Sequence, residues 1–203
     1  MTTIHTMPRT QLEPEHIEVS PKEAGLIIVD MQNDFVDKDG ALYGEASAKI
    51  IPSINYLIKT SRDSDVKVFH TQDWHLPSDV EFKLWPKHCV KGTWGAELTG
   101  IVNRDRNDVL VKKGTIDPWL KSNLASHIRK NNIKTLIVTG TVANICVLHA
   151  VAGAVIRGVR VIVPVDSVAP LTRDALRPTL EQFKNVYKCS LTDARRITYS
   201  NSM

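Results

Sequence analysis

The chain has 203 residues, a formal net charge of +4, 42% hydrophobic residues and 24% charged residues. These values are ordinary for one globular domain with its own core, and no apolar window approaches the roughly 18 residues of a membrane span. Basic residues alternate with acidic ones and form pairs rather than a patch, so we expect neither a nucleic-acid partner nor a membrane partner.

The N-terminal segment is polar and lacks the apolar stretch of a secretory signal. We therefore expect an arm at residues 1–22, followed by a single domain at residues 23–203. Three cysteines in a chain of this length do not form a disulfide framework. The expected compartment is the reducing cytoplasm, in which these cysteines stay thiols.

Apolar runs of strand length alternate with helical patterns along the chain. The runs are nearly continuous and rich in Val and Ile, as in strands covered on both faces; they lie at 25–30, 66–71, 108–113, 135–140, 159–165 and, more weakly, 185–190. Helical spacing occurs at 46–62, 119–132, 145–158 and 171–183, the last with Pro178 as a candidate kink. This alternation predicts an α/β fold with a mostly parallel sheet.

Ligands in open α/β sheets bind beyond the carboxyl ends of the strands, and these ends carry polar residues here. The first run ends in Asp30, the third in Lys112 and Lys113, and the fourth shortly before Cys146. Adjacent strand residues point to opposite faces, so only one lysine can enter a shared site, and we select Lys113. A cap at Asp30 and a buried packing role for Cys146 are the structural alternatives.

These three residues fit a nucleophilic mechanism. The charge of Lys113 and the amino end of a helix starting near Asn144 would favour the thiolate of Cys146, which is otherwise mostly protonated at neutral pH. Asp30 would accept the thiol proton and return it to a leaving amine. The backbone N–H groups of Val142 and Cys146 would hold the oxyanion.

A second group of polar residues lies in QDWHLPSDVEFKLWPKHCV, residues 72–90. Asp73 and His75 would share one face of an extended segment, and His88 would return from the loop. One carboxylate and two imidazoles suit Zn²⁺ or Fe²⁺, with water completing the ligand set. The alternative is three unrelated surface residues, and we interpret Cys89 and Cys189 as structural.

Five segments between residues 25 and 169 resemble the isochorismatase-like cysteine hydrolases, and within them the nicotinamidases. They are GLIIVDMQNDF, TQDWH, WPKHCVKGTWGAEL, VLVKKGT and TGTVANICVLHAVAGAVIRGVRVIVPVDSVA. The resemblance implies a single-domain, Rossmann-like three-layer α/β sandwich with a six-stranded, mostly parallel sheet. It also implies a triad of Cys146, Asp30 and Lys113, and a cis peptide between Thr141 and Val142 that directs the Val142 N–H into the oxyanion hole.

The resemblance further implies a divalent metal on Asp73, His75 and His88. Zinc is the first expectation, with iron and manganese as alternatives, and the ring nitrogen of nicotinamide would take the open position of the metal. Two departures concern specificity. The further histidine that usually follows Asp-Trp-His is missing, with Asp79 or Glu81 nearby, and IDPW at 116–119 replaces a Tyr-Ser-x-Phe stretch.

We expect Phe35, Trp85, Trp119 and Thr141 to line the substrate pocket. The predicted protein is a nicotinamidase-like amidase, which converts nicotinamide to nicotinate and ammonia through a thioester. One alternative is a related hydrolase for another amide or ureido C–N bond, of the carbamoylsarcosine or ureidoacrylate type. The other is a non-catalytic family member. That non-catalytic member would bind a partner instead. For the predicted amidase we expect a small-molecule amide substrate and a homo-oligomer.

Overall fold

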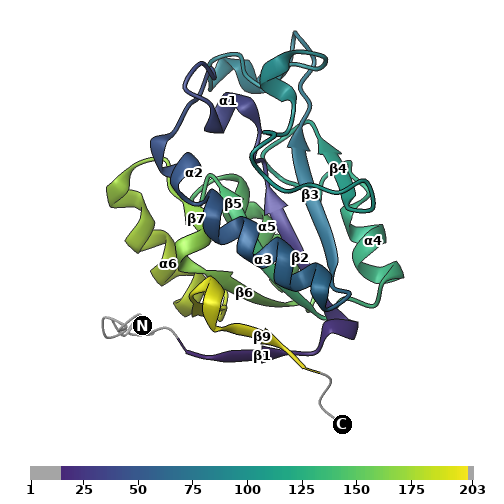
Figure 1. Ribbon diagram of the computed structural model, residues 1–203. Coiled ribbons are helices and arrows are strands. Elements are labelled where there is room, and N and C mark those ends of the chain that lie inside the picture. The colour runs from purple at the N-terminus through teal and green to yellow at the C-terminus, as the bar shows by residue number, and fades with distance from the viewer. Residues whose placement is uncertain (1–14, 201–203) are drawn as a thin grey trace, which may run out of the picture.

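The centre of the fold is a parallel sheet with helices on both faces (Figure 1). The computed structural model describes residues 15–200. Six strands follow the order β4-β3-β2-β5-β6-β8, and the short β7 adds a seventh by pairing with β5. Their bounds are β2 Ala24–Val29, β3 Lys67–Asp73, β4 Val109–Lys113, β5 Thr135–Thr141, β6 Arg160–Pro164, β7 Val168–Ala169 and β8 Ser190–Thr192. The predicted six-stranded α/β sandwich is confirmed, with one short strand more.

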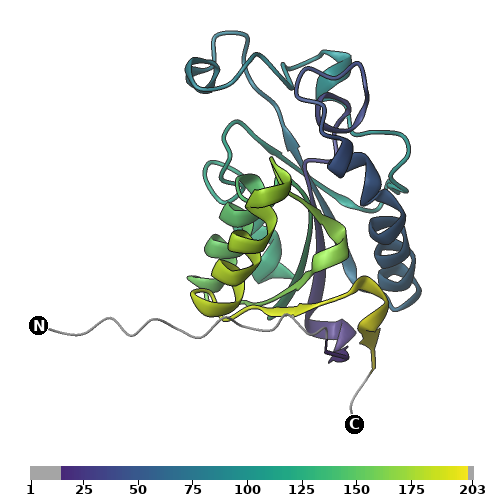
Figure 2. The same cartoon turned by 90° about the vertical axis from the view of Figure 1, so that its left-hand side faces the viewer.

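The helices form one layer on each face of the sheet (Figure 2). The first layer contains α4 (Leu124–Lys130), α5 (Cys146–Val155) and α6 (Leu176–Asn185). The second contains α1 (Asn33–Val36), α2 (Glu45–Lys49) and α3 (Ile51–Asp63). Short 3-10 turns connect the elements: η1 Pro21–Glu23, η2 Val80–Lys83, η3 Trp94–Ala96, η4 Val165–Ser167, η5 Arg173–Ala175 and η6 Ala194–Arg196.

Strand β2 shows why the apolar runs are continuous. Ile27 and Val29 belong to the core under the first helix layer, whereas Leu26 and Ile28 belong to the core under the second. All four side chains are fully buried. Because successive strand residues point to opposite faces, a strand between two helix layers has no position left for a polar side chain.

Four predicted features differ from the observed ones. The helix expected at 119–132 is shorter and covers only Leu124–Lys130. The helix expected at 46–62 is split into α2 and α3, because Pro52 in the first turn of α3 starts a new helix. Pro178 lies in the first turn of α6, where proline is tolerated, so it does not kink a helix interior. The strand expected at 185–190 is wrong. Burial of Phe183 against the core extends α6 to Asn185, and β8 starts only at Ser190.

The two ends of the described chain pair with each other. β1 (Ile17–Val19) forms a two-stranded parallel sheet with β9 (Ile197–Tyr199), and the side chains of Ile17 and Val19 are buried. Residues that we assigned to the N-terminal arm are therefore packed on the domain. The rest of that predicted arm, residues 1–14, lies outside the described residues.

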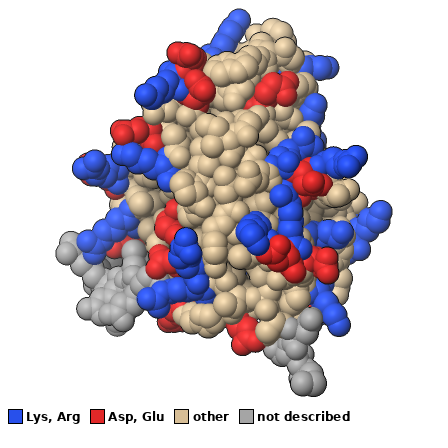
Figure 3. All heavy atoms as spheres, in the orientation of Figure 1, with Lys and Arg blue, Asp and Glu red and all other residues tan. Residues whose placement is uncertain are grey.

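The surface carries both signs of charge. On the face seen in Figure 3, Lys and Arg are interspersed with Asp and Glu, which agrees with the alternation in the sequence. Between residues 15 and 200, no helix has the length and apolar character needed to cross a membrane.

Candidate active site

The carboxyl ends of four neighbouring strands bring polar side chains to one edge of the sheet. Asp30 directly follows β2, and Asp73 at the end of β3 pairs in register with Lys113 at the end of β4. Cys146 follows β5 after a short turn, as the first residue of α5. The three residues predicted to meet do meet, and Asp73, predicted as a metal ligand, joins the same cluster.

Lys113 lies at the centre of this cluster. Its Nζ is 2.8 Å from Asp30 Oδ2, 2.5 Å from Asp73 Oδ1 and 3.8 Å from Cys146 Sγ. The ligand atoms of Asp30, Asp73 and Cys146 all lie within 4.8 Å of one another. All four residues are buried, so their charges interact with little screening by water.

The two adjacent lysines point to opposite faces of β4, as expected. Lys112 is exposed, and its Nζ lies 3.7 Å from the centroid of the Trp74 ring. Lys113 is 2% exposed. Of the two lysines, only Lys113 points into the cluster.

Asp30 is held by its neighbour in β3. The Asp30 N–H donates to Thr71 Oγ1 at 3.1 Å, and the Thr71 hydroxyl donates to Asp30 Oδ1 at 2.6 Å. Asp30 has φ 50°, a left-handed conformation that is rare outside glycine and recurs at functional sites. Beside it, Gly140 has φ 108°, and a Cβ there would lie 2.2 Å from the Val29 carbonyl oxygen. Thr71 is a site residue that the sequence analysis missed.

Burial determines the direction of the pKa shift at Asp30 and Cys146, whereas neighbouring charges determine it at Asp73 and Lys113. Burial raises the pKa of Asp30 and raises that of the Cys146 thiol well above its usual value, although Lys113 acts in the opposite direction on both. Burial also favours neutral Asp73, but Lys113 and His75 outweigh it and lower the pKa of that carboxyl. The two carboxylates raise the pKa of Lys113 well above its usual value against the effect of burial.

Lys113 acts on Cys146 in the expected direction, because its charge lowers the pKa of the thiol, but burial outweighs it and the net pKa is raised. Desolvation of a fully buried sulfur outweighs the attraction of one lysine, because the lysine charge is already shared between Asp30 and Asp73. A hydrogen bond with Asp30 also keeps the proton on the sulfur. Cys146 is a thiol here, with a carboxyl group next to it.

The turn before α5 contains the expected cis peptide between Thr141 and Val142. The Val142 carbonyl accepts the N–H groups of Ile145 and Val147. Among the residues that the structure describes, no acceptor is recorded for the N–H groups of Val142 and Cys146. Two backbone donors thus remain next to the thiol, at the amino end of a helix, where negative charge is favoured.

The side chains of Asp73, His75 and His88 also converge, with ligand atoms within 4.8 Å of one another. His75 Nδ1 lies 3.1 Å from Asp79 Oδ2, and His88 Nδ1 lies 2.7 Å from the Pro86 carbonyl oxygen. These acceptors hold a proton on Nδ1 of both rings, so Nε2 is the nitrogen of each ring that would bind a metal. The buried Nε2 of His75 has no hydrogen-bond partner among the described residues. This is the state in which histidines bind metals, so the three residues fit a divalent ion.

Acidic residues stand near His75 where a further histidine was expected. Asp79 orients the ring, and together with Asp73 it raises the pKa of His75 to about 8, although burial acts in the opposite direction. Glu81 Oε2 lies 3.9 Å from His75 Nε2, and Glu81 Oε1 accepts the Ile116 N–H at 3.0 Å. Glu81 thereby connects His75, one of the three candidate metal ligands, to Ile116 in the wall of the cavity described next.

A cavity of about 420 Å³ opens onto Cys146. Its walls include the aromatic residues Phe35, Tyr43 and Trp85, with Ile116 and His88 beside them. Phe35 and Trp85 therefore lie where the sequence analysis placed them, whereas Tyr43 and Ile116 were missed. Tyr43 and Ile116 lie in loops, and the sequence does not indicate which loop side chains point into the cavity.

Two predicted pocket residues do not line this cavity. The indole N–H of Trp119 donates to the Ala150 carbonyl at 3.1 Å, and its ring packs so closely on α5 that a Cβ at Gly153 would come within 2.0 Å. The tight turn in which Asp117 accepts the Trp119 N–H directs the ring to α5 and leaves Ile116 at the cavity.

Thr141 is the second correction. Its side chain points away from the cavity, and its hydroxyl lies 2.8 Å from that of Ser47 in α2. Side chains alternate along β5, so Thr141 turns its hydroxyl to the second helix layer. Val142, which follows the strand, lines the cavity instead.

Asp34 is a further residue that the sequence analysis missed. Its carboxylate accepts the Cys89 N–H at 2.6 Å and the Ala41 N–H at 3.0 Å. Ala41 is part of the cavity wall, and Cys89 follows His88 in the chain. Asp34 therefore links the cavity wall at Ala41 to the loop that contains His88. Cys89 is buried in this loop, in line with the structural role that we expected.

Residues 24–193 match the isochorismatase domain. The chain belongs to the isochorismatase family. It is 28% identical to the nicotinamidase of Acinetobacter baylyi over 74% of this chain and 85% of that protein. It is 27% identical to a ureidoacrylate amidohydrolase of Serratia proteamaculans over 66% of this chain and 64% of that protein.

A solved structure supports the same assignment. The N-carbamoylsarcosine amidase of Thermoplasma acidophilum is 29% identical and superposes with a TM-score of 0.78, over 85% of this chain and 96% of that one. The names of these three isochorismatase relatives share amide hydrolysis and differ in the substrate. The chain accordingly belongs to a family of hydrolases that act on amides.

Proposed function

We propose that this isochorismatase-family protein hydrolyses a small, uncharged amide, with nicotinamide as the first candidate. The main support for an uncharged substrate is that neither lysine nor arginine lines the cavity. Nicotinamide has no charge to compensate, and its flat ring suits the aromatic walls of Phe35, Tyr43 and Trp85. Ureidoacrylate and N-carbamoylsarcosine each carry a carboxylate, and a carboxylate is costly to bury where no lysine or arginine can pair with it.

In the proposed reaction Cys146 is the nucleophile and Asp30 is the base. Because the thiol pKa is raised, the proton leaves the sulfur for Asp30 as the sulfur attacks the amide carbon. The raised pKa of Asp30 suits this exchange, since it makes the carboxylate a better proton acceptor and a usable acid afterwards. Lys113 keeps its positive charge throughout and stabilises whichever partner is negative.

The tetrahedral intermediate places its negative charge on the former carbonyl oxygen. The free N–H groups of Val142 and Cys146 would donate to this oxygen. When the C–N bond breaks, Asp30 returns its proton to nitrogen, ammonia leaves and a thioester remains on Cys146. Water then attacks the thioester carbon and gives a proton to Asp30. The C–S bond breaks, the sulfur regains that proton, and the acid is released.

Asp73, His75 and His88 would hold a divalent metal, with zinc as the first candidate and iron or manganese as alternatives. When bound, such an ion supplies a Lewis-acid position that the ring nitrogen of a pyridine can occupy. Phe35 and Trp85 would confine the ring between their side chains, and this fixes the distance of the amide carbon from the sulfur.

Ammonia release tests this proposal. Protein loaded with zinc is expected to release ammonia from nicotinamide, and Cys146→Ala is expected to lose at least about a thousandfold in kcat. Ureidoacrylate and N-carbamoylsarcosine should be at least about tenfold poorer in kcat/KM, because no lysine or arginine lines the cavity to pair with their carboxylates, whereas the carboxylate of Asp73 does line it. Faster hydrolysis of either ureido acid would refute the uncharged substrate. No turnover of any amide would favour a non-catalytic family member.

The cellular compartment of the protein is a separate proposal. The cysteines of the described chain, Cys89, Cys146 and Cys189, are all free and buried. A nucleophilic thiol has to remain reduced to act, so we place the protein in a reducing compartment, the cytoplasm.

A further inference from the structure

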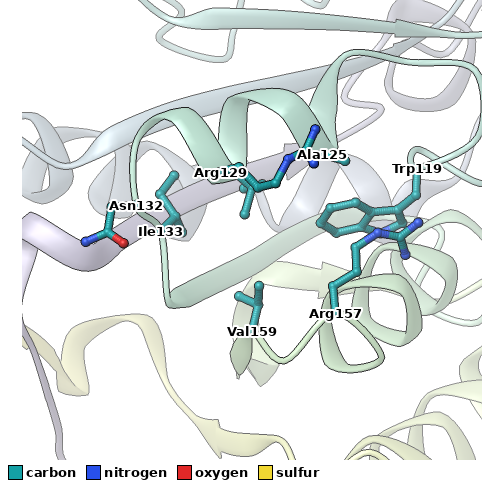
Figure 4. Close-up of a pocket in the computed structure, with 8 residues that line it drawn as sticks. Trp119, Ala125, Arg129, Asn132, Ile133, Arg157 and Val159 are labelled. Atoms are coloured by element: carbon teal, nitrogen blue, oxygen red, sulfur yellow. The ribbon is translucent and has the colours of Figure 1, made fainter.

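A second cavity, of about 540 Å³, lies away from the candidate active site (Figure 4). It is bounded by α4 and by the turn between α5 and β6, near the amino ends of β5 and β6. The candidate active site lies at the carboxyl ends of the strands instead. The two cavities share no lining residue, so the second cannot be an extension of the first.

The second cavity combines an apolar floor with a basic rim. Trp119, Ile128, Ile133 and Val159 are buried and form much of the floor. The polar lining residues are two arginines, Arg129 and Arg157, and the uncharged Asn132. No acidic residue lines it.

Arg157 is fixed before any ligand arrives. Its guanidinium carbon lies 4.7 Å from the centroid of the Trp119 ring, and its Nη1 donates to the Gly153 carbonyl at 2.9 Å. Trp119 is itself anchored through its indole N–H on Ala150. Figure 4 shows the guanidinium lying over the indole. A guanidinium has five N–H donors, so most of the donors of Arg157 remain available to a ligand.

Neither arginine of this rim is neutralised by a carboxylate of the described chain. The arginines that form ion pairs there are Arg62, Arg177 and Arg196. Arg129 comes from α4 and Arg157 from the opposite side of the cavity. Two uncompensated guanidinium groups beside an apolar floor favour a ligand with one negative group and one apolar part.

We propose that this second cavity binds a small organic anion, consisting of a carboxylate, sulfonate or similar group on an aromatic or branched aliphatic body. The anionic oxygens would accept hydrogen bonds from Arg157 and Arg129. The body would cover Ile128, Ile133 and Val159. This inference does not depend on the proposed amide hydrolysis, because no residue of that site takes part.

Titration calorimetry with naphthalene-2-sulfonate tests the proposal on the full chain. We expect saturable binding of one equivalent, and at least about tenfold weaker binding of the uncharged naphthalene-2-sulfonamide. Arg157→Gln should weaken sulfonate binding by about tenfold or more. Arg160→Gln is the matched control, since this exposed arginine is three residues away and does not line the cavity. It should change the affinity by less than about twofold.

A second variant distinguishes binding in the cavity from nonspecific attraction of the sulfonate to surface arginines. Ala125→Phe keeps both arginines and fills the space between them, so it should abolish sulfonate binding while ammonia release stays unchanged. The proposal is overturned if the sulfonate does not bind saturably, or if Arg157→Gln binds as wild type does. Equal losses in Arg157→Gln and Arg160→Gln, or displacement of the sulfonate by nicotinamide, would overturn it as well.

Discussion

At the scale of single residues, Lys113 is the cation that allows the acidic groups of the candidate active site to be buried. It is the common partner of two buried carboxylates, Asp30 and Asp73, and of the Cys146 thiol. A buried charge without a partner is far more costly than a buried pair. The same lysine is therefore expected to matter for stability and for catalysis.

Replacing Lys113 by Met tests this expectation. Two buried carboxylates would lose their cation, so the free energy of unfolding should fall by about 3–5 kcal/mol and ammonia release should be lost. Lys112→Met is the control, because that lysine is exposed and only covers Trp74. Its cost should stay near 1 kcal/mol or below. Urea unfolding measures both variants, and equal behaviour of the two would contradict the central position of Lys113.

Thr71 offers a test of the role of Asp30 as base. Its hydroxyl donates to the carboxylate of Asp30 and lowers the pKa of that group. In Thr71→Val this stabilisation of the charged form is lost, so the pKa of Asp30 rises further and the acidic limb of kcat/KM moves to higher pH. Thr71→Ser should restore the wild-type profile. An unchanged acidic limb in the Val variant would argue that another group is the base.

At the scale of elements, the sequence predicts the strands best where their side chains are completely buried. The runs of β2, β3, β5 and β6 could be predicted because both faces of each strand are covered, whereas β4 at the sheet edge buries one face and exposes Lys112 on the other. The meeting of Asp30, Lys113 and Cys146 followed from the parallel order, since parallel strands end at one edge. Trp119 and Thr141 could not be placed, because a turn and a partner on another helix decide where their side chains point.

A buried cluster joins β3, α3 and the segment before β4. Asp108 Oδ2 lies 2.5 Å from Arg62 Nη2 and 3.1 Å from His70 Nε2. Although burial acts in the opposite direction, the hydrogen bonds from His70 and Arg62 lower the pKa of Asp108 to about 2. Burial lowers the pKa of His70, which is therefore neutral in the folded chain.

This cluster predicts a loss of stability in acid. The contribution of Asp108 is complete above its unfolded pKa of about 3.9 and disappears as the pH falls through its folded pKa. The contribution of His70 is complete above about pH 6.5 and falls below it, because the unfolded imidazole takes up a proton first. Acid should thus weaken the fold in two steps.

The substitution Asp108→Asn isolates the lower step. At pH 7 it should reduce the free energy of unfolding by about 1–2 kcal/mol, and this difference from wild type should shrink between about pH 4 and pH 2. Asp63→Asn is the control, because its partner Lys59 and Asp63 itself are exposed; it should cost less than about 0.5 kcal/mol. Urea unfolding at several pH values provides the comparison. A difference that does not change with pH would contradict the assigned ionisation.

At the scale of the whole molecule, two cavities of opposite character lie at opposite ends of the strands. The cavity at Cys146 has aromatic walls and no lysine or arginine, whereas the second has a rim of arginines. We expect ligands of different charge in the two. The homo-oligomer that we expect for this fold stays a prediction, and light scattering of the purified protein measures it directly.

The central claim is that Cys146 carries the acyl group of an uncharged amide during hydrolysis. Intact-protein mass spectrometry after rapid acid quenching of the reaction with nicotinamide tests it most directly. A nicotinoyl adduct should appear on the wild-type chain, map to the peptide that contains Cys146, and be absent from Cys146→Ala. Turnover of nicotinamide with no adduct in either protein, or with an adduct on Cys89 or Cys189, would contradict the account.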